Sequence, residues 1–444
     1  MKREIDMTGG NLTLDVLLFS LPLMLSNLLQ IIFNLADVAV VGQFAGPHAL
    51  GSVGSTTLFV TLFTLLIIGL ASGENVITAY ALGAGDDRSA EETVRTSFVL
   101  SIVSGLIIMA VSEAGAAVVL RLVNTREELF AGALLYVRIY FLGLPALSVY
   151  NFGSAVYSAG GDTKKPLVYL TVSGILNVIL NLFFVLVLGM DVDGVALASI
   201  IAQYLSAFLV VRAMLLETSS FRLVPAKEKP DLQTVRRILQ IGLPAGFQNV
   251  IFMASNLFIQ SGINTFSAEV VAGCAAAFSL DTVIFDTISS FYVACTSFMG
   301  QNFGAGKKER ISRSYHLCLA YSVLMSLILG LFLRAFGPVC LRLFTSDPAV
   351  IAGGMERISV LGLSIWMSAF MDCTIAASRG IGKSAVPTVI VFSGACVIRI
   401  IWVYTVFAFF KTPASLFAAF PFTWGITSAA EILYYRWSFA KLQI

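Results

Sequence analysis

The stretch LTLDVLLFSLPLMLSNLLQIIFNLADVAVV, residues 12–41, decides the fold class of this chain. A helix needs about 20 apolar residues to cross the hydrocarbon core of a bilayer, and this stretch exceeds that length. It is also much longer than the ~7–15-residue apolar core of a cleavable signal peptide. We therefore expect it to remain in the protein as the first membrane-spanning helix.

The rest of the chain shares this apolar character. Of its 444 residues, 57% are hydrophobic and only 12% are charged, whereas about a quarter of the residues in a soluble domain are charged. Most of the surface must therefore face hydrocarbon rather than water. The net charge of +2 is too small to indicate a nucleic-acid partner.

Apolar stretches of spanning length recur along the chain and predict an all-α integral membrane protein with twelve transmembrane helices. The predicted spans are 13–41, 52–82, 94–120, 128–158, 166–188 and 194–216, followed by 238–264, 271–302, 314–341, 348–378, 385–410 and 414–436. A long polar segment, ETSSFRLVPAKEKPDLQ, separates the two sets. We expect an N-terminal six-helix lobe at 1–218, a cytoplasmic linker at 219–232 and a C-terminal six-helix lobe at 233–444.

The two halves repeat in sequence and place both termini on one side of the membrane. Pro22 and Asn34 match Pro244 and Asn256 at a spacing of 222 residues. Because six spans separate equivalent points, the repeats have the same orientation, which is typical of a transporter with its site between two pseudo-symmetric bundles. Most Lys and Arg residues fall on the side that holds the termini, so the positive-inside rule puts both termini in the cytoplasm.

Polar side chains form stripes on the predicted spans. The stripes consist of Asn27, Gln30, Asn34 and Asp37 in span one, Asn177 and Asn181 in span five, and Asn249, Asn256 and Gln260 in span seven. Each stripe keeps to one helical face. Unpaired polar groups in hydrocarbon cost several kcal/mol each, so the stripes face partner helices or water. Helix-packing contacts remain an alternative, but matching stripes in both halves favour a polar cavity in each lobe.

Asp37 is the main candidate for coupling to an ion gradient. A carboxylate among apolar residues can take up a proton on one side of the membrane and release it on the other. It can also bind Na⁺ together with amide oxygens, and no other metal site is expected. The alternative is a structural carboxyl that only accepts hydrogen bonds from neighbouring donors.

The second half adds four ionisable residues inside predicted spans: Asp281, Asp286, Asp372 and Arg399. Arginine keeps its charge in proteins, so Arg399 needs a carboxylate or a wet cavity. We expect it to pair with one of these three Asp residues, either structurally or as part of a substrate cavity. Glu74 and Glu431 are weaker candidates because they lie closer to helix ends, where long side chains can reach the interface.

Motifs for nucleotide or catalytic chemistry are absent from the sequence. It contains no GxxxxGK[ST], HExxH or GxSxG pattern and no paired His and Cys. We therefore expect no enzyme activity and no cofactor beyond a coupling ion, H⁺ or Na⁺, and any active transport must be secondary.

Several stretches resemble the multidrug and toxic compound extrusion (MATE) family. They are Leu21-Pro22 with Asn34-Leu35-Ala36-Asp37-Val38, Gly83-Ala84-Gly85-Asp86, Gln301-Asn302-Phe303-Gly304-Ala305-Gly306, and Arg379-Gly380 with Pro387. The resemblance implies two six-helix bundles arranged in a V and efflux driven by H⁺ or Na⁺ entry. It also implies a coupling site at Asp37 with Asn34, Asn177, Asn181 and Ser199. Several family members carry Asp where this chain has Asn181, so a two-carboxylate proton site is not expected.

The sequence thus predicts a multidrug antiporter that exports cationic or amphipathic drugs or metabolites by alternating access. A flippase for a lipid-linked saccharide or anionic lipid is the alternative within the same superfamily. An integral-membrane enzyme or a channel fits less well, because no nucleophile–base pair is present and a two-lobe repeat suits alternating access. We expect a small organic substrate, a bacterial inner-membrane location and a monomer.

Overall fold

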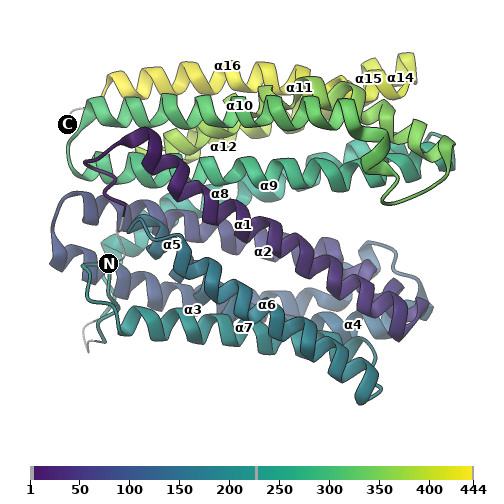
Figure 1. Cartoon of the computed structure of the whole chain (residues 1–444), viewed down its shortest axis with the longest axis horizontal. Coiled ribbons are helices and arrows are strands. Elements are labelled where there is room, and N and C mark those ends of the chain that lie inside the picture. The colour runs from purple at the N-terminus through teal and green to yellow at the C-terminus, as the bar shows by residue number, and fades with distance from the viewer. Residues whose placement is uncertain (1–4, 226–228, 443–444) are drawn as a thin grey trace. The chain divides into compact units, whose positions relative to one another are not determined.

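The computed structural model describes residues 5–225 and 229–442, and this part of the chain is helical without any strand (Figure 1). The first half contains α1 Leu12–Val40, η1 Val41–Ala45, α2 Pro47–Gly83, α3 Asp87–Leu122, α4 Glu127–Phe141, α5 Leu144–Ala159, α6 Lys164–Leu182, η2 Phe183–Val187 and α7 Val192–Leu215. The second half contains α8 Leu232–Ile263, α9 Ala268–Gly304, α10 Lys308–Leu341, α11 Pro348–Gly380, α12 Ala385–Val391, η3 Phe392–Val397, α13 Ile398–Trp402, η4 Val403–Phe407, α14 Ala408–Phe410, α15 Pro413–Phe417 and α16 Ala419–Ala440. Segments labelled η are π-helical.

The predicted spans are confirmed. Among the described residues, 11 helices are long and apolar enough to cross a membrane, and the bent pair α4 and α5 makes 12. The bend of 46° falls between Phe141 and Leu144, where Pro145 occupies the first turn of α5. A proline ring cannot continue the preceding helix without loss of a hydrogen bond, which accounts for the break. Pro22 and Pro244, in contrast, lie inside continuous helices.

Backbone conformations repeat with the sequence. Gly85 lies two residues after the end of α2 at φ 69°, and its repeat partner Gly306 lies two residues after the end of α9 at φ 68°. Gly161 after α5 and Gly382 after α11 also match, at φ 86° and 77°. Glycine is the residue that adopts this left-handed conformation at little steric cost. The duplication inferred from sequence therefore extends to the turns that end equivalent helices.

Compact packing divides the described chain into two units. The first consists of Leu25–Gly246 together with Ile5, and the second consists of 6–24 and Phe247 onward. The boundaries fall inside α1 and α8, two residues after Pro22 and Pro244, and not at the linker predicted at 219–232. The predicted lobe limits of 1–218 and 233–444 stay a prediction.

The segment before α1 belongs to the second unit because its backbone carbonyls accept hydrogen bonds there. The Asn302 side-chain amide and the Arg310 Nε both donate to the carbonyl oxygen of Met7, each at 3.0 Å. Lys307 donates to the carbonyl of Thr8 at 2.8 Å. Met7 is fully buried. These contacts fix residues 7 and 8 to the ends of α9 and α10.

Each unit is a helix bundle with a large aliphatic and aromatic core. In the first unit, α2 packs on α3, α4 and α5, and α7 packs on α4, α5 and α6. In the second unit, α9, α10 and α11 pack on one another and α16 lies along α11 (Figure 1). Phe59, Phe63 and Phe141 form edge-to-face pairs in the first core. Such pairs contribute beyond the area that they bury.

Helix α3 shows how a bundle in hydrocarbon sorts its residues. Ile107, Val111 and Val118 are 58–60% exposed on one face, and they point to where lipid lies. The opposite face buries the small residues Gly105 and Ser112. Lipid is as apolar as leucine, so helices associate in membranes through close packing of small residues.

Glycine contacts between α2 and α8 illustrate this packing and lead to a prediction. A Cβ at Gly73 would lie 2.4 Å from the Ile238 carbonyl oxygen and 2.9 Å from the Gly242 nitrogen. Gly73→Ala should therefore destabilise the protein by about 1–3 kcal/mol, measured by unfolding in detergent.

Gly54 on the same helix provides the matched control. A Cβ there meets no atom within 4 Å, so Gly54→Ala should hold or raise stability by roughly 0.5–1 kcal/mol. Equal effects of the two substitutions would contradict the proposed close approach of α2 and α8.

Candidate functional site

The first unit brings together the acidic and amide residues predicted for coupling. The Asn181 side-chain amide of α6 donates to the Asp37 carboxylate of α1 at 2.5 Å. The same amide lies 3.4 Å from the side-chain oxygen of Asn177, one turn away. Asn177 and Asn181 are 6% and 0% exposed. These three residues form an oxygen-rich cluster, which we name the acid–amide cluster.

The helices that carry the acid–amide cluster both leave α geometry directly after it. The π-helical segment η1 begins at Val41, one turn beyond Asp37, and η2 begins at Phe183, two residues beyond Asn181. Such π-helical turns often occur at functional sites. The side-chain oxygen of Asn181 is buried and has no hydrogen-bond donor among the described residues. With the Asp37 carboxylate, it offers the oxygen ligands that hard cations prefer.

Other predicted residues of the first half lie apart from these hydrogen bonds. Gln30 and Asn34 are exposed on α1, and Asn27 is half-buried. Ser199 of α7 is buried, but its hydroxyl donates to the Val195 carbonyl at 3.1 Å rather than to Asp37. The cavity role predicted for the exposed amides stays a prediction.

The prediction that Arg399 pairs with one of the three aspartates was wrong. Its guanidinium donates to Ser255 and Asn256 of α8, each at 3.2 Å, and to Thr423 of α16 at 3.3 Å. No carboxylate of the described residues lies within ion-pair distance of it. Arg399 also covers the Phe420 ring at 4.5 Å from its centroid. Neutral oxygens and an aromatic face therefore take the place of the expected aspartate.

Asp281 pairs with a different arginine. The Arg357 Nε on α11 donates to the Asp281 carboxylate on α9 at 2.7 Å, and both side chains are at most 6% exposed. The sequence analysis did not single out Arg357. Its register identifies it as buried, because it follows Gly353 and Gly354 by one turn and precedes Leu361 and Ile365 on the buried face of α11.

The remaining candidates of the second half are distributed over several helices. Asp286 and Asp372 are half-buried on α9 and α11, Asn249 is half-buried on α8, and Gln260 is exposed and donates to Asn264 at 2.8 Å. The side-chain oxygen of Gln248 on α8 accepts from Arg379 at 3.0 Å. These cavity assignments stay predictions.

Two glutamates are deeper than the sequence analysis expected. Glu74 is 3% exposed and Glu431 is fully buried, so neither extends to the interface. Both Glu431 oxygens lack a hydrogen-bond donor among the described residues. Sequence spacing does not report this burial, because it depends on which neighbouring helix covers the residue.

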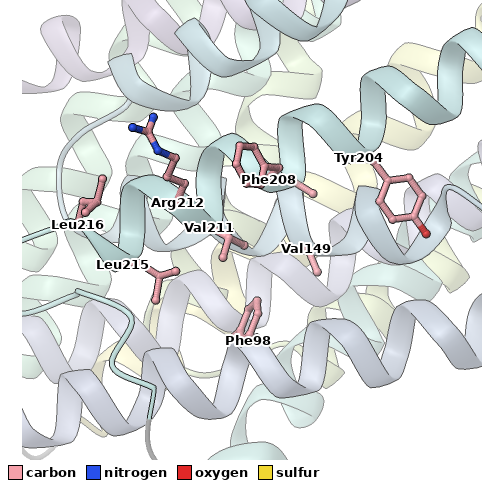
Figure 2. Close-up of a pocket in the computed structure, with 9 residues that line it drawn as sticks. Phe98, Val149, Tyr204, Phe208, Val211, Arg212, Leu215 and Leu216 are labelled. Carbon is pink, nitrogen blue, oxygen red and sulfur yellow. The ribbon is translucent and has the colours of Figure 1, made fainter.

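A groove in the first unit is lined by residues of α3, α5 and α7. Its volume is about 580 Å³. Figure 2 shows Val211 and Leu215 on the side of α7 that faces Phe98 of α3, whereas the Arg212 guanidinium points away from Phe98. The lining residue Phe208 is 62% exposed. No residue predicted for ion coupling or substrate binding lines this groove.

The duplicated helices, the spans and the buried polar residues define a polytopic membrane protein of the transporter class. The family model described as MatE matches residues 22–183 and again 244–405. The chain therefore belongs to the MatE family of multidrug efflux transporters. The two matches start 222 residues apart, which agrees with the repeat read from the sequence.

Relatives and solved structures agree with this assignment. The chain is 29% identical to the probable multidrug resistance protein YpnP of Bacillus subtilis over 80% of each chain. It is 25% identical to the probable multidrug resistance protein NorM of Thermotoga maritima, over 85% of this chain and 82% of that one. A structure titled as the outward-facing conformation of a multidrug resistance MATE family transporter matches with a TM-score of 0.91 at 20% identity, covering 99% and 98% of the chains. At that identity the structural match supports the fold.

The buried Arg357–Asp281 ion pair generates a prediction. Asp281→Asn leaves the Arg357 charge buried and uncompensated, so it should destabilise the protein by roughly 3–5 kcal/mol. The double variant Asp281→Asn with Arg357→Met should be destabilised less than the single variant Asp281→Asn. The measurement is unfolding in detergent.

Glu269→Gln in the exposed first turn of α9 is the control, and it should change stability by at most about 0.5 kcal/mol. If the double variant were less stable than the single Asp281 variant, the proposed compensation would be refuted.

Proposed function

We propose that this protein exports amphipathic organic compounds, cationic drugs or metabolites among them, in exchange for H⁺ or Na⁺. The observation that carries the proposal is the contact between Asp37 and Asn181 at 2.5 Å within the spanning part of the first unit. A half-buried carboxylate that accepts a hydrogen bond from a buried amide can bind a proton or a sodium ion and release it when its surroundings change. Membership of an efflux family supports the direction of transport.

The membrane potential supplies enough free energy to drive exchange through a carboxylate that binds one cation. One elementary charge moved through a potential of 100 mV gains about 2.3 kcal/mol. A coupling ion does work only if its site faces one side of the membrane in one state and the other side in the second state. Alternating access of a duplicated bundle provides these two states. Asp37 would then bind the ion in one state and release it in the other.

The proposal includes a location and an orientation. We place the protein in a bacterial inner membrane with both termini in the cytoplasm, because most Lys and Arg residues lie on the side of the termini. The expected partners are the bilayer and a small organic substrate, with no nucleic acid, and the protein would act as a monomer.

Asp37→Asn tests the coupling role. It keeps the size and polarity of the side chain but cannot carry the charge, so substrate efflux from proteoliposomes should fall at least about 10-fold. Expression and unfolding temperature should stay close to those of the wild type. Asp15→Asn, in the first turn of the same helix, is the matched control and should retain transport. Full activity of the Asp37 variant would remove this carboxylate from the mechanism.

The coupling ion can be identified by imposing one gradient at a time. Proteoliposomes with only a pH gradient and others with only a sodium gradient should differ in substrate movement, since one ion drives exchange. The driven movement should disappear in the Asp37→Asn variant and after an ionophore collapses the effective gradient. Transport that proceeds equally without either gradient would show that the protein is not an antiporter of these ions.

A further inference from the structure

Arg399 is a buried cation, and no carboxylate of residues 5–225 and 229–442 lies within ion-pair distance of it. It is 2% exposed and contacts three neutral oxygens, those of Ser255, Asn256 and Thr423. A guanidinium has five N–H donors, and its Nε finds no acceptor among the described residues. An isolated charge inside a membrane protein carries a large desolvation cost unless an opposite charge or water compensates it.

A second arginine adds positive charge to the same place. The Arg357 and Arg399 guanidinium carbons lie 5.6 and 4.5 Å from the centroid of one ring, Phe420. Asp281 is the carboxylate that binds this pair, and it binds through Arg357. The group formed by Arg357, Arg399 and Asp281 therefore carries one positive charge in excess, and that excess lies at Arg399.

The cationic group occupies a position in the second repeat that is equivalent to that of the acid–amide cluster in the first, and its charge has the opposite sign. Asn34 of α1 corresponds to Asn256 of α8, and Pro166 at the start of α6 corresponds to Pro387 of α12 at a spacing of 221. By the second spacing, Arg399 matches Val178, the residue after Asn177. Each unit therefore has a polar site between its equivalents of span one and span five, acidic in the first and basic in the second.

Helix geometry near Arg399 also resembles that near the acid–amide cluster. Arg399 lies in α13, a five-residue α-helical segment between the π-helical segments η3 and η4. The segment η4 occupies nearly the same repeat position as η2, which follows Asn181. Interrupted helices are typical of ion and substrate sites in transporters.

We propose that the second unit binds a compact anion, either a halide or a carboxylate group, at Arg399. The hydrogen bonds to Ser255, Asn256 and Thr423 use three of the five donors, which leaves Nε and one N–H of Nη2. These adjacent donors are the edge by which a guanidinium holds a carboxylate with two parallel bonds. Of its three partners, Ser255 and Thr423 are fully buried and Asn256 is exposed, so Asn256 marks the side from which the anion arrives.

This site is independent of ion coupling at Asp37, and direct binding measurements separate the two. The probes are [³⁶Cl]chloride and [¹⁴C]benzoate, each titrated onto the purified full-length protein in detergent by equilibrium dialysis. We expect saturable binding of at least one probe at about one per chain. Saturation by chloride identifies a free-halide site, and saturation by benzoate with weak chloride binding identifies a site for the carboxylate of an organic molecule.

Asn256→Asp is the decisive variant. It places a new carboxylate where the Asn256 oxygen already lies 3.2 Å from Arg399, and an internal counter-charge should displace the external anion. Binding should weaken at least about 10-fold and the unfolding temperature should rise. Asn264→Asp makes the same chemical change at the exposed end of the same helix and should bind like the wild type.

Arg399→Met should also weaken binding at least about 10-fold, and the Asn256 variant keeps the test valid if the Met variant fails to fold. Asp37→Asn should retain anion binding even if it loses transport, so failure of the coupling proposal would not be mistaken for failure of this one. Absence of saturable binding of both probes to the wild type would overturn the anion site. Wild-type affinity in Asn256→Asp would also overturn it.

Discussion

The constraint on which the structure depends is that hydrocarbon offers no hydrogen bonds. Every backbone and side-chain polar group inside the spans must therefore find its partner within the protein. Hydroxyls meet this demand locally, as when Ser199 donates to the carbonyl of Val195. Glycines such as Gly73 let helices approach so closely that little space remains between their backbones. Charged residues cannot be satisfied locally, so their partners come from distant parts of the chain.

This constraint explains what the sequence could predict and what it could not. Span positions follow from apolar length alone, whereas the bend before α5 could not be read from proline alone, because Pro22 and Pro244 lie inside continuous helices. The family resemblance placed Asp37 and Asn181 in one coupling site, and the hydrogen bond between them comes from the structure. The neutral partners of Arg399 were missed, because which side chains of α8, α9 and α16 face it depends on how these helices rotate about their axes. Sequence spacing does not report that rotation.

The duplication preserved geometry more faithfully than charge. Left-handed glycines close equivalent helices in both halves, and Asn34 and Asn256 keep one residue type at one register. Between these fixed points, the first unit has a carboxylate with two amides and the second has a guanidinium with neutral oxygens. A scaffold set by glycine, proline and apolar packing thus tolerates opposite charges at corresponding places. The polar residues of the two units can therefore differ while the positions of their helices in the repeat stay the same.

The unit boundaries inside α1 and α8 have a consequence for the gene as well as for the protein. Each half of the coding sequence begins with a segment that completes the bundle encoded mainly by the other half. A polypeptide made from either half alone would carry its own first half-helix as a surplus segment and would lack the one that the other half supplies. Two such fragments would have to exchange these segments before either bundle was whole, as in a domain-swapped dimer. In the present chain both halves belong to one polypeptide, so each bundle receives its missing segment without a second copy.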